Sequence, residues 1–365
     1  MKYIKGLDGI RAIAVSMVIL QHYYYDYLIS KSNSIGSLGV GVFFVLSGFL
    51  ITQILLHEKD KVGESIIRKY SKFTIRRSIR IFPLYYVVLI FGMTSGIYWF
   101  SEINQLWHAL YATNIYMFIH GDWTGYTVHF WSLDVEEQFY IIWPLVVLLT
   151  PRRNLFNVFL ATIFIGPLSL ALKPFLGING ISAYVLPFSH LDSLGLGSML
   201  ALYVSREGSI ARVSRGSLLL ISTFSALTYF LYEVYKDHNM IETMHYISKV
   251  AVNALTCAII LYLIQNQSGR LTFLLEMKPL KFIGGISYGI YLIHKLTPEI
   301  YVHTSFTPVD THLWVNIVIW LTTTVALASA SWFFIEKPLI SNKGKIEIFF
   351  LNFLPSRKKL NNSRH

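Results

Sequence analysis

Apolar runs of about 20 residues recur along the whole chain, and they restrict what it can fold into. A helix needs about 20 consecutive apolar residues to cross the hydrocarbon core of a bilayer. The sequence offers ten such runs, at residues 9–29, 38–56, 81–100, 131–149, 155–173, 186–204, 217–235, 246–265, 282–301 and 313–335. We therefore expect an all-α fold, a polytopic membrane helix bundle with about ten transmembrane helices.

The charge content agrees with a membrane protein. Charged residues make up 14% of the chain, whereas soluble globular domains contain about 25%, so the chain has too little charge to cover a soluble surface of its size. The formal net charge of +11 raises the question of nucleic-acid binding. In a chain this apolar, cationic cytoplasmic loops explain the charge better. We expect contact with membrane lipid and none with nucleic acid.

The distribution of Lys and Arg predicts the orientation of the spans. With the amino terminus placed inside, 26 of the 31 basic residues fall in inner segments. The outer segments hold the remaining five, Lys31, Lys173, Lys236, Lys249 and Lys295. Because cytoplasmic loops concentrate positive charge, both termini are expected in the cytoplasm. We expect one transmembrane domain over residues 1–340 and a basic cytoplasmic tail over 341–365, and an aromatic-rich outer connection at 100–130 that lies along the interface or tucks back between helices.

The first span carries an ionisable group at each end of the stretch "RAIAVSMVILQH". Such groups are costly in a membrane and usually face the bundle interior or a watery cavity. Arg11 and His22 lie on one helix face, because eleven residues at about 100° each make three turns plus about 20°, with a rise of about 16 Å. Asp8 is placed one turn before Arg11 and is expected to pair with it. His22 suits proton exchange near neutral pH; the alternatives are a hydrogen-bonded core histidine for His22 and a membrane anchor for Arg11.

Three carboxylates occupy the start of the fourth span, "HFWSLDVEEQFYIIWPL". Asp134 and Glu137 share a helix face, and Glu136 points about 100° away. Two adjacent glutamates cannot both face lipid, so at least one of them must look into the bundle. A carboxylate often orients a catalytic histidine, which makes Glu136 or Glu137 a candidate partner of His22. A salt bridge or a charge at a helix amino terminus is the structural alternative, and it fits Asp134 best.

Arginines cluster in "TIRRSIRIFPLYY", just on the inner side of the third span. Arg77 and Arg80 are one helical turn apart and form a fork suited to phosphate groups, with Arg76 beside them. Cytoplasmic anchoring of the helix is the alternative. No His or Cys spacing resembles a metal site, and the chain has one cysteine, so no metal is expected.

Together these motifs resemble the acyltransferase-3 family of membrane acyltransferases, of the standalone type without an SGNH domain. The match spans nearly the whole chain. Its pieces are "LDGIRAIAV", Arg-x10-His (Arg11, His22), "FFVLSGFLI", the Arg-x-x-Arg pair (Arg77, Arg80), "SLDVEEQFY", "SYGIYLIH" and Glu-x-Pro (Glu336, Pro338). Within these motifs lie further supporting positions, Ser47, Ser132, Tyr140, Tyr288, His294 and Glu336, and Glu336 is expected to pair with an arginine of the inner surface.

The resemblance implies transfer of an acyl group, most often acetyl, from cytoplasmic acyl-CoA to a hydroxyl of a glycan or lipid-linked sugar at the cell inner membrane. O-antigen, exopolysaccharide and lipochitooligosaccharide are the acceptors it suggests. The arginine fork would hold the phosphates of acetyl-CoA, and an extended pantetheine arm of about 15–20 Å would carry the thioester to His22. His22 would either deprotonate the acceptor or become transiently acylated. The competing interpretation is a proton-coupled exporter of a sugar conjugate.

Overall fold

The computed structural model describes residues 3–29, 35–94, 104–206, 214–235, 241–303 and 313–353, and within them the chain forms helices and no strands. The longer helices are α1 (Leu7–Ile19), α2 (Ile35–Lys59), α3 (Ile66–Thr94), α6 (Phe130–Leu149), α7 (Leu155–Leu172), α9 (Leu191–Arg206), α10 (Arg215–Tyr235), α11 (Ile241–Gln265) and α16 (Leu313–Ser331). Short α-helices are α4 (Gln105–Ala109), α5 (Thr113–His120), α8 (Gly180–Val185), α12 (Arg270–Leu275), α13 (Lys278–Gly285), α14 (Ser287–Ile293), α15 (Leu296–His303), α17 (Lys337–Ser341) and α18 (Lys343–Leu351). Two π-helical segments, η1 (Leu20–Ile29) and η7 (Trp332–Glu336), continue α1 and α16.

Five segments of the described chain are long and apolar enough to cross a membrane, and they coincide with predicted spans. They are Ile35–Lys59, Ile66–Thr94, Arg152–Leu172, Tyr246–Gln265 and Leu313–Ser341. Helices also lie in the other predicted spans, although α6 carries three carboxylates and α9 has only 16 residues. The prediction of an all-α, multi-pass membrane protein is confirmed.

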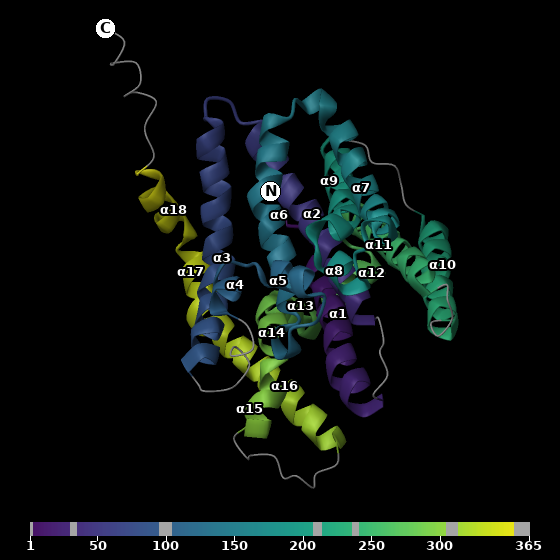
Figure 1. Cartoon of the computed structure of the whole chain (residues 1–365). Helices are drawn as coiled ribbons and strands as arrows, with labels where there is room; N and C mark the ends of the chain where they lie inside the picture. The colour runs from purple at the N-terminus through teal and green to yellow at the C-terminus, as the bar shows by residue number, and fades with distance from the viewer. Residues whose placement is uncertain are drawn as a thin grey trace.

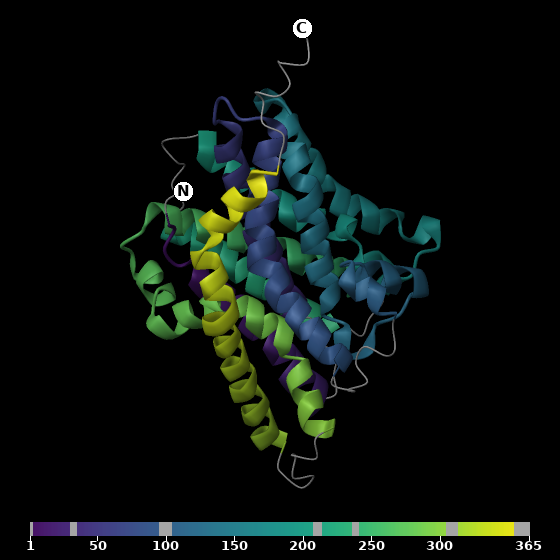
Figure 2. The same cartoon turned by 90° about the vertical axis from the view of Figure 1, so that its left-hand side faces the viewer.

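The long helices stand roughly side by side, as Figures 1 and 2 show. Helices α1, α2, α6 and α9 lie in the middle of the bundle, and α10 with α11 forms a pair at one side (Figure 1). At another side, η7, α17 and α18 pack along α3 (Figure 2). The carboxy-terminal helices therefore pack against α3, which begins at Ile66 and is far away in the sequence.

The distribution of Lys and Arg assigns each loop to one side of the membrane. Loops that are assigned to the same side are in contact with one another in the structure. The Arg152 side chain pairs with Asp60, and Arg206 donates to the carbonyl oxygen of Arg152 at 3.2 Å. On the opposite side, Asn179 donates to the carbonyl oxygen of Gly121 at 3.1 Å. These contacts join inner loops with inner loops and outer loops with outer loops, as the predicted topology requires.

Helix α2 packs directly on α9 through glycines. A methyl group at Gly48 would overlap the carbonyl oxygen of Leu194, and one at Gly197 would overlap that of Val45. Small residues allow this close backbone approach inside membranes. The glycine contacts therefore set the position of α2, one wall of the cavity described below.

Replacing Gly48 by alanine is expected to destabilise the protein by about 1–3 kcal/mol, because the added methyl group must push α9 away from α2. Thermal unfolding in detergent measures the effect. Gly63 is the matched control, since nothing lies within 4 Å of the Cβ position of that loop glycine, although its positive φ adds some strain of its own. Unfolding of Gly48→Ala at the wild-type temperature would contradict the packing argument.

Two local features differ from the sequence-based expectation, and a third agrees with one of its two alternatives. Helix α3 begins at Ile66 and continues through the arginine cluster, with Phe73 and Leu84, eleven residues or about three turns apart, buried on one face. The predicted span at 282–301 is divided among α13, α14 and α15. The outer connection tucks back between helices, as one of the two alternatives stated: His108 and Asn114 are fully buried there.

The segment after residue 340 is helical as far as the structure describes it. Helix α18 packs on α3, and Glu347 accepts hydrogen bonds from Arg76. Residues 354–365, the basic end of the predicted tail, lie outside the described residues.

Candidate active site

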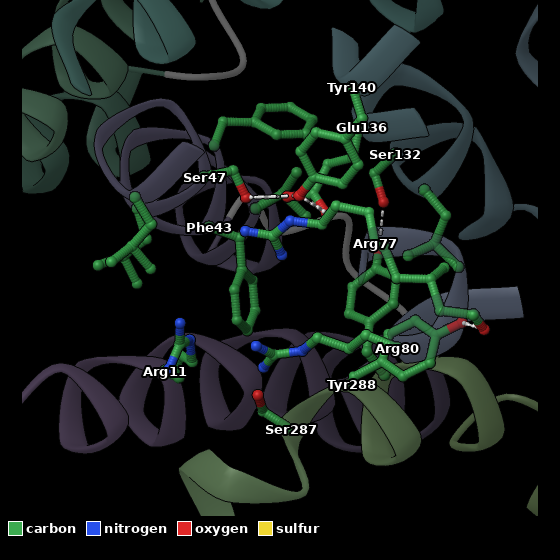
Figure 3. A pocket seen from close by; sticks show the side chains of 17 residues that line it. Arg11, Phe43, Ser47, Arg77, Arg80, Ser132, Glu136, Tyr140, Ser287 and Tyr288 are labelled. Atoms are coloured by element: carbon green, nitrogen blue, oxygen red, sulfur yellow. Dashed lines mark hydrogen bonds between the residues drawn. The ribbon is translucent and has the colours of Figure 1, made fainter. Parts of the chain in front are cut away.

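A cavity of about 110 Å³ lies between α1, α2, α3, α6 and α14, which is room for several water-sized groups. Its lining includes eight of the residues that the sequence had singled out. They are Arg11, Ser47, Arg77, Arg80, Ser132, Glu136, Tyr140 and Tyr288. Figure 3 shows the side chains of Arg77 and Arg80 entering the cavity from one side and Arg11 standing on the other. Residues from segments more than 270 positions apart therefore form one polar chamber inside an apolar bundle.

Three guanidinium groups meet at this cavity, and only one of them has an ion-pair partner in the described chain. Arg11 donates to Asp8 Oδ1 at 2.6 Å, which is the predicted pair. Arg77 lies over the ring of Tyr140, 5.2 Å from its centroid. Neither Arg77 nor Arg80 comes within 4 Å of a carboxylate oxygen among the residues described. The chamber thus carries more positive than negative charge.

Glu136 is the carboxylate that faces the cavity. Ser47 donates to Glu136 Oε1 at 2.6 Å, and Tyr140 donates to Glu136 Oε2 at 3.1 Å. The hydroxyls of Ser47 and Tyr140 are themselves 3.1 Å apart, which closes a triangle (Figure 3). Between the two adjacent glutamates, the structure therefore places Glu136 on the cavity and Glu137 elsewhere.

The other two carboxylates of α6 point away from the cavity. Glu137 is buried, and its Oε1 has no hydrogen-bond partner among the described residues. Asp134 is fully buried and accepts from the backbone N–H of Asn114 at 3.0 Å, in the first turn of α5. Asp134 therefore has the role of a charge at a helix amino terminus, the structural alternative stated for it.

Arg76, predicted with the phosphate-binding fork, lies outside the cavity. Its Nε donates to Glu347 Oε2 at 2.6 Å and its second amino group donates to Oε1 at 3.2 Å. Arg76 also lies 3.7 Å from Glu58. Arg76 therefore does not line the cavity with Arg77 and Arg80, because adjacent residues on a helix point about 100° apart.

Replacing Arg76 by alanine is expected to lower the unfolding temperature slightly and to leave ligand binding at the cavity unchanged. The lost contacts are ion pairs of a side chain that is 41% exposed, and such pairs contribute about 0–1 kcal/mol each. Thermal unfolding and ligand titration of the same sample measure both quantities. A change in ligand affinity without a change in stability would show that Arg76 belongs to the site after all.

His22 pairs with a histidine and not with a carboxylate. Its Nδ1 lies 2.8 Å from Nε2 of His294, and the two rings stack with centroids 5.0 Å apart. The prediction that Glu136 or Glu137 orients His22 is therefore wrong: Glu136 bonds to Ser47 and Tyr140 instead. His294, predicted as a supporting residue, is fully buried beside His22.

A thin layer of polar and aromatic side chains separates the cavity from the histidine pair. Tyr291 lines the cavity, and its ring centroid is 5.7 Å from that of His294. The hydroxyls of Tyr291 and Ser132 form a short hydrogen bond with each other, and each lies 3.2 Å from the carbonyl oxygen of His129, which accepts from the hydroxyl that does not donate within the pair. Tyr291 was not predicted, although it lies one turn before His294 in the motif "SYGIYLIH" and so shares its face.

Two further predicted residues border this region. Tyr288 lines the cavity, and its hydroxyl donates to the carbonyl oxygen of Ile81 at 2.8 Å. Glu336 is buried in the π-helical segment η7 and accepts from Ser331 at 3.1 Å. Arg80 is its electrostatic neighbour, but the two form no ion pair within 4 Å in the described structure.

The structure also contains a buried ion pair away from the cavity that was not predicted from the sequence. Lys249, counted as an outer-loop residue, lies inside α11 with its ammonium nitrogen 2.9 Å from Asp192 Oδ1 and 2.8 Å from the carbonyl oxygen of Ser189. The sequence gives no periodic signal that joins the two residues.

The family of the chain follows from a comparison with protein-family models. A model described as an acyltransferase domain matches residues 4–336. The chain belongs to this acyltransferase family. Every helix that lines the cavity falls inside the match, and so does the histidine pair. The resemblance to the acyltransferase-3 family is therefore confirmed.

Relatives of this acyltransferase carry related names. The peptidoglycan O-acetyltransferase OatA of Listeria monocytogenes is 29% identical over 99% of this chain and 58% of its own length. The putative peptidoglycan O-acetyltransferase YrhL of Bacillus subtilis is 31% identical over 93% of this chain and 55% of its own. A putative O-acetyltransferase of Staphylococcus aureus is 30% identical over 98% and 60%. The chain thus spans less than two thirds of these proteins, and no solved structure matches it.

Proposed function

We propose that the chain is an acetyl-CoA-dependent O-acetyltransferase of the cell inner membrane. It moves an acetyl group from cytoplasmic acetyl-CoA to a hydroxyl of a cell-envelope glycan. One observation carries the proposal: three arginines meet in a membrane-embedded cavity with a single carboxylate facing them. Such a chamber needs an anion to balance its charge.

The phosphates of acetyl-CoA supply that anion. Arginine is the residue best suited to phosphate oxygens, because its planar guanidinium donates two parallel hydrogen bonds. Arg77 and Arg80 form no ion pair within the described chain, so their donors remain for a ligand. Arg11 is held by Asp8 and faces them across the cavity.

The distances suit delivery of the thioester to the histidine pair. Arg11 and His22 are separated by a helix rise of about 16 Å, which matches the length of about 15–20 Å of an extended pantetheine arm. The cavity reaches Tyr291, whose ring adjoins that of His294. A thioester in the cavity would reach the histidine pair past the side chains of Tyr291 and Ser132, which line the cavity on that side.

The transfer itself needs a base and a leaving group. The acceptor hydroxyl gives its proton to His22 as its oxygen attacks the thioester carbonyl carbon. The carbon–sulfur bond breaks, and the thiolate of CoA takes up the proton from His22. The products are an acetyl ester and free CoA, and no oxidant or metal takes part in the balance.

Peptidoglycan is the first acceptor to test. Two relatives carry peptidoglycan in their names, whereas O-antigen, exopolysaccharide and lipochitooligosaccharide were suggested by the family resemblance alone. The shared requirement is a sugar hydroxyl that reaches His22 from the outer half of the bundle.

Mass spectrometry of the host's cell-envelope glycans, with and without the gene, tests this function. A transferase predicts that the glycan remains in normal amount and loses only its alkali-labile acetyl groups. A proton-coupled exporter predicts that the sugar conjugate itself disappears from the surface. Glycans with unchanged acetylation in the strain without the gene would contradict the proposal.

A further inference from the structure

The two imidazoles of the histidine pair come from segments 272 residues apart, in η1 and just after α14. His22 Nδ1 and His294 Nε2 are 2.8 Å apart, and the ring planes differ by 23°. The other nitrogen of His294, Nδ1, lies 2.6 Å from the carbonyl oxygen of Tyr291. Two consecutive hydrogen bonds thus run from His22 through His294 to Tyr291, and each ring nitrogen in them can be assigned as a donor or an acceptor.

The assignment starts at the carbonyl oxygen of Tyr291. A carbonyl oxygen only accepts hydrogen bonds, so Nδ1 of His294 must carry its hydrogen. In neutral His294 the Nε2 atom then holds a lone pair and accepts. Its donor is Nδ1–H of His22, which leaves the lone pair of neutral His22 on Nε2.

We propose that His294 is a positioning residue that fixes His22 in the tautomer with hydrogen on Nδ1, so that Nε2 is the base for the acceptor hydroxyl. This inference rests on the proposed function. The arrangement parallels the serine-protease triad, in which an aspartate holds the catalytic histidine by its Nδ1–H. Here a neutral ring replaces the carboxylate.

A neutral partner suits this position. His294 is fully buried, and taking an ionised carboxylate out of water costs several kcal/mol unless it is paired and hydrogen-bonded. An imidazole accepts the same hydrogen bond without that cost. When His22 takes the hydroxyl proton on Nε2, its Nδ1–H becomes a charge-assisted donor to His294 and the bond strengthens.

The surroundings hold His294 in place. Its ring packs edge-on against His129, with centroids 4.9 Å apart, and its backbone carbonyl oxygen accepts from the hydroxyl of Tyr23 at 2.5 Å. Tyr23 also hydrogen-bonds to Thr324 in α16 at 2.8 Å. Because Tyr23 follows His22 in the chain, the same contacts fix both partners.

Two variants separate a positioning role from a structural one. His294→Gln places an amide oxygen near the Nε2 position and keeps an acceptor for His22, whereas His294→Phe keeps a ring and removes the acceptor. We expect His294→Phe to lower kcat about 10²–10⁴-fold, the range of general-base catalysis, with His294→Gln within about tenfold of wild type. The affinity for acetyl-CoA, measured by titration, stays at the wild-type value in both.

Equal losses of kcat in the two variants, or no loss in either, would overturn the inference. Thermal unfolding of both variants accompanies the kinetics. If His294 only stabilises the fold, kcat per folded molecule stays at the wild-type value in both variants while the unfolding temperature falls, which also contradicts a positioning role.

Nitrogen NMR gives a readout that needs no acetyl transfer. In ¹⁵N-histidine-labelled protein in lipid bilayers, the resonances missing from His22→Phe belong to His22. We expect a protonated Nδ1 and an unprotonated Nε2 at a pH where the ring is neutral. The opposite tautomer, or a mixture, would overturn the inference. The expected tautomer in a protein that transfers no acetyl group would instead count against the proposed function alone.

Discussion

Replacing His22 by alanine is expected to lower kcat for acetyl transfer about 10²–10⁴-fold, the contribution of a positioned general base. The dissociation constant for acetyl-CoA should stay at the wild-type value. The reason is the separation of the two centres: the donor phosphates are assigned to the arginines of the cavity, whereas His22 lies behind Tyr291, paired with His294.

His120→Ala is the matched control for this experiment. His120 is exposed at the end of α5, and its Nδ1 bonds to the carbonyl oxygen of Tyr116 in its own helix. Its loss should leave both kcat and donor affinity unchanged. If a folded His22→Ala protein acetylated its glycan at the normal rate, the catalytic role of His22 would be wrong.

The double variant Arg77→Ala with Arg80→Ala is expected to raise the dissociation constant for acetyl-CoA about 100-fold or more. A hydrogen bond to a charged group contributes about 1.5–3 kcal/mol, and about 1.4 kcal/mol changes an affinity tenfold. Titration of the purified protein with acetyl-CoA at two salt concentrations measures the effect. The wild-type affinity should weaken with salt more than that of the variant, because fewer charges meet the phosphates in the variant.

Two further variants of the arginines extend the same titration: lysine substitutions at Arg77 and Arg80, and alanine at Arg76 as a control. Lysine keeps the charge and loses the planar fork, so Arg77→Lys with Arg80→Lys should bind with intermediate affinity. Arg76→Ala, a loss of the same side chain one position away, should bind as wild type does, since Arg76 pairs with Glu347. If the double alanine variant bound acetyl-CoA with the wild-type affinity, the phosphate-binding role would be wrong and both arginines would act only as membrane anchors.

Local periodicity predicted the parts of the site that lie within one helix. The pairing of Asp8 with Arg11 and the turn between Arg77 and Arg80 depend only on a spacing of three residues. The apolar runs likewise predicted the helices, because their length is set by bilayer thickness. Changes of helix type inside those runs were not predicted. In η1, which continues α1, the backbone changes to a π-helix, a form often found at functional sites.

Contacts between distant segments were beyond a single sequence. The partner of His22 is 272 residues away, and nothing in either local pattern specifies how α14 packs against α1. The carboxylates of α6 were favoured as partners because a carboxylate often orients a catalytic histidine. Which of Glu136 and Glu137 faces the cavity depends on the rotation of α6 about its axis. The packing of α2 against α6, where Ser47 bonds to Glu136, shows this rotation, and the sequence of α6 alone does not.

Transfer of label from radiolabelled acetyl-CoA by the purified chain tests the proposed O-acetyltransferase activity. The protein is reconstituted in lipid with peptidoglycan fragments as acceptor, and ester-linked label is counted after separation. We expect label in the glycan with wild-type and Arg76→Ala protein, and little or none with His22→Ala or with Arg77→Ala and Arg80→Ala together. Equal labelling by all four proteins, or label that enters the glycan without the chain, would contradict it.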